Sequence, residues 1–368
     1  MKKKFFSALM AGVLATVCLT GCGPINSYIR ETEAEIEAGK EEFQEKAPEL
    51  GQQSQDLMNS MVEGFPTVNE DGTLSYPKVT MTDRSGNEIS VSSKVEKIVS
   101  MSPSTTELLI ELGLADKIVA CDTYSGFSSF ASELGDIPQF DMMAPDCESI
   151  VALNPDVVIT TGMSYAHGDD VYAAVKAADI CVADIPSAAS LDDIKKDIEF
   201  IGELTGTKEQ ADAIIAEMDE YKSELEVVAS SIDEKKTVLY VMSVPTADYP
   251  DVYTCGMGTY MDEIFDVCGL ENVAGDIEYQ WPALSEEDII AENPDVIIVG
   301  DNYTPDAVDA ILAIDTWKDI TAVKNGEVYL IDGDSFNQPN QFVYDSAYEI
   351  ITYAYPEETK ELSDPFEN

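Results

Sequence analysis

Positive charge is scarce in this sequence. Its 368 residues contain 21 lysines and arginines against 71 aspartates and glutamates, which gives a formal net charge of −50 at pH 7. Such a surface repels nucleic acid and anionic lipid headgroups, so the composition argues against a nucleic-acid-binding role. Arginine occurs only as Arg30 and Arg84. Bidentate, permanently charged recognition of an anionic ligand is therefore absent from the chain beyond Arg84.

Histidine and paired cysteines are also scarce. His167 is the only histidine, whereas capture of a bare zinc or manganese ion usually takes two or more imidazoles. Five cysteines follow Cys22, an odd number, and no CxxC pair occurs. Cys121 and Cys181 lie in apolar strand-like runs, where we expect buried free thiols.

The N-terminus has the pattern of an export signal. Three lysines at 2–4 precede an uncharged run at 5–19, which is too short to span a bilayer comfortably. The following "LTGC" resembles a bacterial lipobox, which predicts a cleaved signal peptide at 1–21 and a diacylated Cys22. The alternative is an ordinary cleaved signal with a stray cysteine. Two acyl chains would be enough for stable membrane attachment.

The region after the signal changes character twice. Residues 22–76 are polar and acidic, and we interpret them as a tether between lipid and body. Residues 78–93 alternate around a central "SGN", which predicts a small hairpin. From Lys94 onward, short apolar strands alternate with helices, as parallel sheets covered on both faces require. In the first helix, the spacing of Ser104 and Glu107 indicates a capping box.

A repeat organises the rest of the chain. "ESIVALNPDVVI" at 148–159 returns as "EDIIAENPDVII" at 287–298, and a helix ending in Gly-Leu precedes each copy. Between the halves, apolar residues at helical spacing predict a long helix near 207–231. The fold class is therefore α/β, with two lobes of similar build and mainly parallel strands, joined by one long helix. The expected boundaries are 77–189 for the N-terminal lobe with its hairpin, 190–234 for the connecting helices and 235–368 for the C-terminal lobe.

Aromatic side chains gather in the loops that follow the predicted strands. The carboxyl ends of parallel strands are where α/β proteins bind ligands. We expect these loops to face one cleft and to bind the ligand through Tyr124, Tyr165, His167, Tyr253, Trp281, Tyr303 and Phe336. For each ring taken alone, the alternative interpretation is that it anchors its loop to the lobe.

Several motifs resemble one known family. "KIVSMSPSTTELLIELGLADKIVACDTYS", "ESIVALNPDVVI", "CGLENVAG" and "WPALSEEDIIAENPDVIIVG" are similar to the substrate-binding proteins of ABC importers for cobalamin and iron complexes. The resemblance covers residues 78–356. It implies two Rossmann-like lobes with modest closure, and a permease and an ATPase as partners. Together with the predicted lipid at Cys22, we expect a monomer tethered to the outer face of the cytoplasmic membrane by lipid alone. The resemblance also implies one glutamate per lobe that docks onto permease arginines, and the matching positions are Glu148 and Glu287.

The ligand is narrowed by what the loops lack. Without arginine or lysine in the strand-end loops, the site is less suited to an anionic siderophore than to a ligand with a large neutral face. A corrinoid is therefore the first candidate. The resemblance to cobalamin binders is closest at Tyr124, Tyr253, Trp281 and Phe336. At further positions where those proteins have aromatic residues, this chain has Met142 or Met143 and Thr161. An iron complex or haem is the alternative. No resident cofactor is expected, because the metal would arrive with the ligand.

Two features keep other chemistry open. His167 follows a strand, so it is either a hydrogen-bonding loop residue or an axial ligand to the metal of a bound chelate, with Tyr165 nearby. The competing class is a surface-anchored α/β enzyme. No GxSxG, P-loop or HExxH motif supports it, and Cys255 in "CGMG" is the nearest candidate for a reactive group. We therefore expect a binding protein without catalytic residues.

Overall fold

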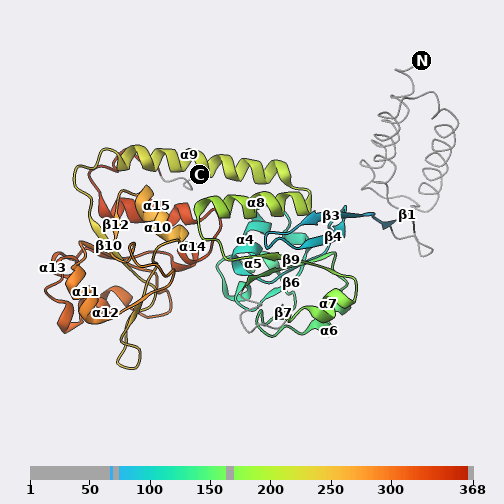
Figure 1. Ribbon diagram of the computed structural model, residues 1–368, viewed down its shortest axis with the longest axis horizontal. Coiled ribbons are helices and arrows are strands. Elements are labelled where there is room, and N and C mark those ends of the chain that lie inside the picture. The colour runs from blue at the N-terminus through green and yellow to red at the C-terminus, as the bar shows by residue number, and fades with distance from the viewer. Residues whose placement is uncertain (1–66, 69–73, 163–169, 364–368) are drawn as a thin grey trace, which may run out of the picture. The chain divides into compact units, whose positions relative to one another are not determined.

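The computed structural model describes residues 67–68, 74–162 and 170–363 (Figure 1). The chain divides into two compact units, Met1–Val79 and Thr80–Asn368. The described part of the first unit includes an antiparallel pair, β1 (Thr67–Val68) and β2 (Leu74–Ser75). The expected signal peptide and most of the expected tether lie outside the described residues.

The first lobe contains a five-stranded, all-parallel sheet in the order β7-β6-β5-β8-β9. The predicted hairpin forms beside it from β3 and β4, which pair as a separate two-stranded sheet. The elements are β3 (Lys78–Thr82), β4 (Glu88–Ser92), β5 (Ile98–Ser100), α4 (Pro103–Glu111), η2 (Ala115–Lys117), β6 (Ile118–Asp122), η3 (Ser125–Phe127), α5 (Ala131–Leu134), β7 (Gln139–Phe140), α6 (Cys147–Leu153), β8 (Val157–Thr161), α7 (Ala173–Ala177) and β9 (Cys181–Ile185).

The second lobe contains a four-stranded parallel sheet in the order β12-β10-β14-β15, with a short antiparallel pair formed by β11 and β13. The elements are β10 (Thr237–Val241), β11 (Val252–Tyr253), α10 (Tyr260–Val267), β12 (Glu271–Asn272), β13 (Ala283–Leu284), α11 (Glu286–Glu292), β14 (Val296–Val299), α12 (Ala307–Leu312), η5 (Asp315–Trp317), α13 (Thr321–Asn325), β15 (Val328–Leu330), α14 (Gly333–Asn337) and α15 (Val343–Ala354).

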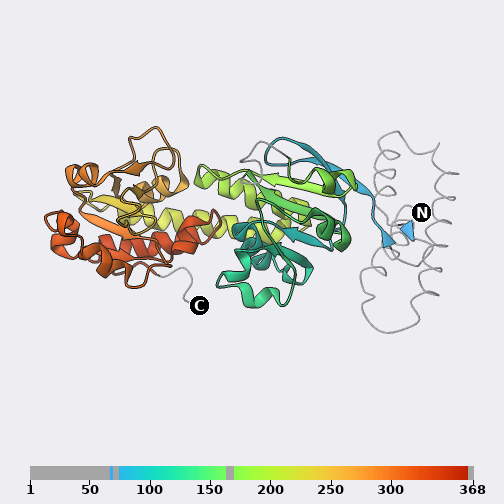
Figure 2. The ribbon, with the colours of Figure 1, turned by 90° about the horizontal axis from the view of Figure 1, so that it is seen from below.

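The two sheets share one topology. The order β6-β5-β8-β9 in the first lobe corresponds to β12-β10-β14-β15 in the second, and the two sheets are separate (Figures 1 and 2). In each, the first strand of the lobe is central and the strand after the repeated helix lies next to it. The sequence repeat is therefore a repeat of topology, and the predicted fold class is confirmed.

The repeated Asn-Pro-Asp ends one helix and starts the central strand pair. Asn154 and Asn293 close α6 and α11 in the left-handed region, both at φ 49°. The Asp156 carboxylate then accepts hydrogen bonds from the backbone N–H groups of Glu96 and Lys97, just before β5. Asp295 does the same for Thr237 at the start of β10. Each aspartate thus ties the repeated strand to its neighbour at the edge opposite the strand-end loops.

The repeated Gly-Leu pair ends its helix in the same way in both lobes. Gly113 after α4 and Gly269 after α10 adopt φ values of 76° and 71°. The N–H groups of Gly113 and Leu114 donate to Ile110 and Leu109, which is the double hydrogen bond of a Schellman motif. The same pair of bonds closes α10. Glycine is favoured at both positions because a side chain is strained at positive φ.

Both sheets are covered on both faces, as their continuous apolar strands predict. In β10, Val238 and Tyr240 belong to one core and Leu239 and Val241 to another. The alternation follows from the period of two along a strand. The N-terminal sheet divides in the same way, with Ile98 and Val99 on opposite sides.

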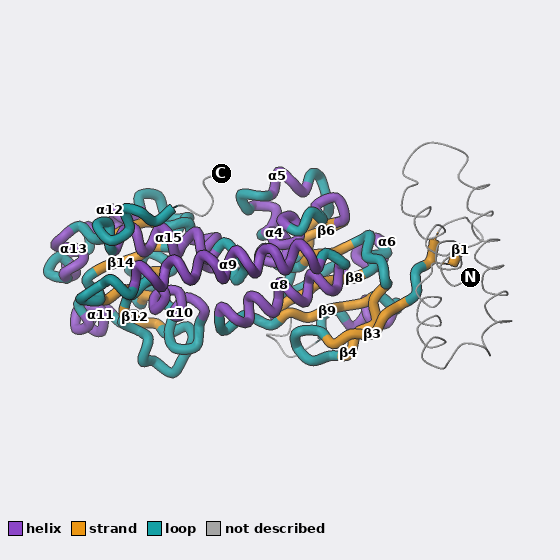
Figure 3. The backbone as a smooth tube through the Cα atoms, turned by 90° about the horizontal axis from the view of Figure 1, so that it is seen from above, coloured by secondary structure: helices purple, strands orange, loops and turns teal. Residues whose placement is uncertain are grey.

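Two helices connect the lobes, and the second of them is the predicted long helix. After α8 (Leu191–Thr205), the long helix α9 (Lys208–Ala229) turns back and packs against α8, α10 and α15 (Figures 1 and 3). The predicted inner face of α9 is confirmed, since Ala211, Met218, Tyr221 and Leu225 are buried. A Cβ atom on Gly202 of α8 would meet the Ala211 Cβ at 2.5 Å, so glycine permits the close approach.

The predicted capping box at Ser104 and Glu107 is wrong. The helix α4 begins two residues earlier than this box requires, at Pro103, with Ser102 as N-cap and no side-chain capping bond. Proline at the first position sets φ for the helix and donates no hydrogen bond, so the start moves to it. By contrast, Asp146 caps α6 by accepting a hydrogen bond from the Ser149 N–H.

Gly333 supports the end of β14 through a backbone contact. A Cβ atom on Gly333 would lie 2.0 Å from the carbonyl oxygen of Gly300, which cannot yield as a side-chain tip could. We expect Gly333→Ala to lower the free energy of unfolding by about 2–4 kcal/mol through overpacking. Urea unfolding would measure the loss. Gly326→Ala, where open space surrounds the Cβ position but φ is 74°, is the control for backbone strain alone.

Candidate ligand-binding site

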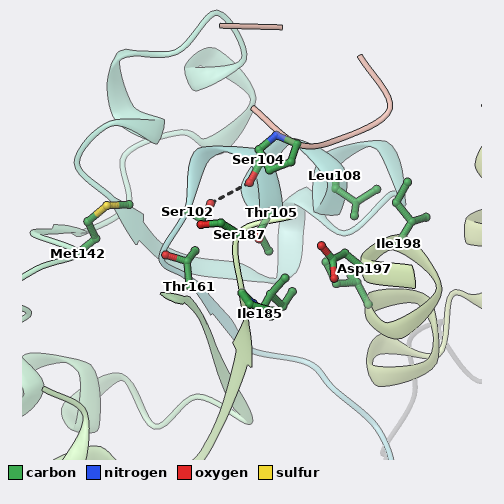
Figure 4. Close-up of a pocket in the computed structure, with 13 residues that line it drawn as sticks. Ser102, Ser104, Thr105, Leu108, Met142, Thr161, Ile185, Ser187, Asp197 and Ile198 are labelled. Atoms are coloured by element: carbon green, nitrogen blue, oxygen red, sulfur yellow. Dashed lines mark hydrogen bonds between the residues drawn. The ribbon is translucent and has the colours of Figure 1, made fainter. Parts of the chain in front are cut away.

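A cavity of about 160 Å³ lies at the carboxyl ends of the N-terminal strands (Figure 4). Strands β5, β8 and β9 each place residues in its wall at or just after their ends, and the rest comes from α4, α8, Met142 and one proline of the C-terminal lobe. The lining residues are Ser102, Ser104, Thr105, Leu108, Met142, Thr161, Ile185, Pro186, Ser187, Asp197, Ile198, Ile201 and Pro339. This is the sheet edge at which the sequence predicts the ligand.

Hydroxyl groups supply most of the polar atoms of this wall. Ser102 and Ser104 are hydrogen-bonded through their hydroxyls at 2.9 Å, and Thr161 and Ser187 also line the cavity (Figure 4). The volume is below the roughly 300–1,000 Å³ of a pocket that encloses a drug-sized ligand. The cavity can therefore hold a small polar substituent of a large ligand, whose bulk must lie outside it.

The one charged side chain in the wall is already paired. Asp197 accepts a hydrogen bond from Arg84 Nε at 2.5 Å, and Arg84 also lies 3.6 Å from Asp193. Burial raises the pKa of Asp197 to about 6, against the opposing effect of Arg84. Arg84 thus fastens the β3–β4 hairpin to α8, and its charge is neutralised by two carboxylates. This placement agrees with an absence of free arginine at the strand ends.

Two of the predicted aromatics are held on matching turns. In "DTYS", the buried Asp122 accepts hydrogen bonds from the N–H groups of Tyr124 and Ser125, at 2.8 and 3.1 Å. Burial raises the pKa of Asp122, although Ser125 opposes the shift. The turn leaves the Tyr124 side chain 62% exposed. The rigid backbone therefore presents a tyrosine whose ring is free to contact a ligand.

The second turn, "DNYT", repeats this arrangement in the other lobe. Asp301 accepts from the N–H groups of Tyr303 and Thr304, each at 3.0 Å, and from Val244 at 2.9 Å. Burial pushes the pKa of Asp301 upward, but these bonds outweigh it and hold the pKa below its usual value. Tyr303 is 87% exposed. Each lobe thus offers one tyrosine on an aspartate-braced turn at a strand end.

Tyr253 and Trp281 lie at a short antiparallel strand pair, Tyr253 within it and Trp281 just before it. Tyr253 in β11 lies directly opposite Ala283 in β13, and the Gly256 N–H donates to Gln280 at 2.9 Å, so backbone hydrogen bonding extends past Trp281. Trp281 lies two residues before Ala283, just outside β13. Both are solvent-accessible, at 53% for Tyr253 and 36% for Trp281.

Phe336 requires a correction. The sequence places it in a strand-end loop, but it lies in α14 and is fully buried. Its ring packs edge-on against Tyr240 at 4.9 Å and against Phe265 at 5.7 Å between centroids. The ring is part of the hydrophobic core because α14 packs over the end of the sheet. We therefore leave Phe336 out of the ligand-binding set.

Three of the sequence-based assignments fall on residues outside the described part of the chain: Tyr165, His167 and Cys22. Within the described residues, no group of three or more His, Cys, Asp or Glu side chains is placed to hold a metal ion. Nor does any helix there combine the length and apolar content needed to cross a bilayer.

All five cysteines after Cys22 are free thiols, and Cys121 and Cys181 are buried, as predicted. Cys255 is fully buried, and burial raises the pKa of its thiol far above the usual value. It is therefore a poor nucleophile, because the thiolate is the reactive form. The nearest candidate for an enzymatic group thus has the properties of a core residue.

Glu148 and Glu287 occupy equivalent positions. Each is the second residue of its helix, α6 or α11, each helix is capped by a side chain, and both glutamates are exposed. A carboxylate in the first turn is favoured by the helix dipole, worth about 0.3–1 kcal/mol. The same geometry leaves one anchored acidic group on each lobe.

The cavity wall was missed by reasoning from sequence. The rings of Tyr124, Tyr253, Trp281 and Tyr303 are not part of it, whereas Ser102, Ser187 and Pro339 are. The signal was present, since "SPS" directly follows a predicted strand, but serine in a loop is too common to single out. Met142 and Thr161, the two departures from the aromatic pattern, do line the cavity.

Comparison with known proteins agrees with this geometry. A family model described as periplasmic binding protein matches residues 98–335. The uncharacterized ABC transporter substrate-binding lipoprotein YvrC of Bacillus subtilis is 31% identical over 284 residues, which cover 77% of this chain and 87% of that protein.

Two further similarities concern ligands. A protein of Halobacterium salinarum named cobalamin-binding protein is 27% identical over 280 residues, covering 74% of this chain and 72% of that protein. The solved structure of a possible iron-binding periplasmic solute-binding protein from Staphylococcus epidermidis superimposes with a TM-score of 0.62 at 25% identity. It covers 72% of this chain and all of that one.

Proposed function

We propose, because this chain belongs to the periplasmic binding protein family, that it is the substrate-binding protein of an ABC importer and captures a corrinoid of the cobalamin type. The bound ligand is delivered to a permease, and the chain itself performs no catalysis. In this role the protein works as a monomer on the outer face of the cytoplasmic membrane, with the permease and its ATPase as partners.

The observation that carries this proposal is the set of exposed aromatic rings on rigid supports at the strand ends. Tyr253 lies in β11, Trp281 lies just before its partner strand β13, and Tyr124 and Tyr303 stand on aspartate-braced turns. Flat apolar contact of this kind suits a large macrocycle. The hydroxyl-lined cavity suits a neutral amide substituent at the edge of such a ring, because hydroxyls can both donate and accept.

Charge supports a neutral ligand over an anionic one. Arg84 is engaged by Asp193 and Asp197, so its guanidinium has no free fork for a carboxylate or catecholate. The similarity to a protein named for cobalamin binding points the same way. An iron complex or haem is the second candidate, and it is supported by the similarity to a possible iron-binding protein. In that case His167 or Tyr165 would be the residues to test as iron ligands.

Lipid attachment at Cys22 is part of the proposal. It rests on the "LTGC" sequence after a short apolar run and on the similarity to a protein named as a lipoprotein. Membrane fractionation of cells expressing the full chain tests it. Recovery of the protein in the soluble fraction would argue for an ordinary cleaved signal instead.

Ligand identity is testable by titration. The protein from residue 23 onward is titrated with cyanocobalamin, dicyanocobinamide, haem and a ferric siderophore, while tryptophan fluorescence is followed. Trp317 is buried at 1% exposure, so Trp281 should supply the quenched signal. We expect quenching by the two corrinoids and its loss in Trp281→Phe. Binding of the siderophore alone would refute the argument from arginine.

A further inference from the structure

One hydrogen bond joins the two lobes beside the cavity. Asn340, in the segment between α14 and α15, donates from Nδ2 to Glu107 Oε2 of α4 at 2.6 Å. Asn340 is 1% exposed, and its Oδ1 accepts from the Phe342 N–H at 2.9 Å. This second bond fixes the amide orientation, so the nitrogen faces Glu107. The glutamate that the sequence assigns to a capping box is thus a contact to the other lobe.

The same segment completes the cavity wall. Pro339, one residue before Asn340, is the C-terminal-lobe residue that lines the cavity, and Leu108, one residue after Glu107, lines it from the other lobe. The hydrogen bond between Glu107 and Asn340 therefore lies next to the point where the lobes meet around the cavity. If this bond is lost, Pro339 loses its nearest polar tie to α4.

The charges that act most strongly on Glu107 have its own sign. They are Glu111, one turn further along α4, and Asp332 and Asp334 at the start of α14. The elements on which α4 packs, β5 and η3, contain no ionisable side chain, and Asp122 behind η3 is bonded to Ser125 and Tyr124. Burial raises the pKa of Glu107 to about 7. The three acids add to this shift, and the bond from Asn340 opposes it.

We propose that Glu107 and Asn340 form a proton-sensitive clasp between the lobes, which seats Pro339 in the cavity wall while Glu107 is protonated and loosens when it ionises. The proposal rests on the proposed function in so far as the cavity is part of the ligand site. Glu107 and Asn340 act here as positioning residues, since neither side chain lines the cavity.

The sign of the pH effect follows from the two states of the clasp. When the clasp opens, Glu107 returns to water and its pKa falls toward the usual 4.5. The closed state thus binds the proton more tightly. The free-energy advantage of the closed state over the open state is complete below pH 4.5 and is lost as the pH rises through about 7. Because Glu107 is partly exposed and the cavity is only part of the site, we expect ligand affinity to fall by about three- to tenfold between pH 5 and pH 8.

The test compares two variants that remove the titration in opposite ways. Glu107→Gln keeps the hydrogen bond without the charge, so cyanocobalamin should bind at every pH with the low-pH affinity. Asn340→Ala removes the clasp, so its affinity should be equally flat but at the weaker, high-pH level. Asp116→Asn, an exposed residue of the same lobe, makes the same charge change and should keep the wild-type profile.

A ligand-free measurement separates failure of the clasp from failure of the proposed function. Hydrogen exchange of the backbone N–H groups at 338–344, corrected for the intrinsic pH dependence, should show protection that declines from pH 5 to pH 8 in the wild type and stays constant in Glu107→Gln. If cyanocobalamin does not bind, the ligand assignment is wrong, and the hydrogen-exchange result alone decides whether the clasp exists. Exchange that is independent of pH in the wild type, or equally pH-dependent in Glu107→Gln, would overturn it.

Discussion

Reversing the charge at both Glu148 and Glu287, as Glu148→Arg with Glu287→Arg, should reduce ligand uptake by about 100-fold or more while leaving ligand affinity unchanged. The physical reason is that each exposed carboxylate stands at the same position of its lobe, at the capped start of α6 or α11. A permease that grips both lobes through arginines would meet repulsion at two points. Uptake of labelled ligand in cells, with titration of the purified variant, measures both quantities.

The control for net charge is Glu209→Arg with Glu224→Arg. Both residues are exposed on α9, away from the starts of α6 and α11, and the change in total charge is identical. This variant should transport at close to the wild-type rate. If both pairs lower uptake equally, the effect is one of overall charge and the docking assignment is wrong. If the first pair leaves uptake intact, the two glutamates do not dock.

The second large effect is expected for the aromatic pair. Truncation of Tyr253 and Trp281 together to alanine should weaken binding of the cognate ligand by about 30- to 1,000-fold, since buried aromatic anchors are worth roughly 1–2 kcal/mol each. Both side chains are exposed in the free protein, so the fold should survive. Isothermal titration calorimetry gives the affinity, and thermal unfolding confirms the structure.

Val227→Ala is the matched change for this experiment. Val227 is an apolar residue, 70% exposed on α9, and it lies outside every strand-end loop. Its truncation should alter ligand affinity by less than about twofold, as for a surface position. If the Tyr253→Ala, Trp281→Ala double variant binds the ligand as well as the wild type, these two side chains are not part of the binding site.

The fold was predictable because its signals are local and repeated. Asn154 and Asn293 end their helices at the same backbone angles, and Gly113 and Gly269 close theirs with the same pair of hydrogen bonds. Such requirements act over a few residues, so they leave a pattern that can be recognised without coordinates. The parallel order of the strands then follows from alternation of strand and helix.

The site was predictable only in part, for a physical reason seen in particular residues. Tyr124 and Tyr303 were found because an aromatic in a strand-end loop is conspicuous, and the structure adds the aspartates that brace them. Phe336 was misplaced because burial depends on how α14 packs over Tyr240 and Phe265, which no local pattern records.

From the sequence alone came the two parallel-sheet lobes, the helical connection, the Gly-Leu pairs that end two helices, and the family. These are decided by periodicity and by hydrogen bonds between near neighbours. The cavity, the pairing of Arg84 with Asp197, and the bond from Asn340 to Glu107 across 233 residues were decided by tertiary structure. Contacts between distant segments depend on where the lobes meet, and only the folded chain specifies that.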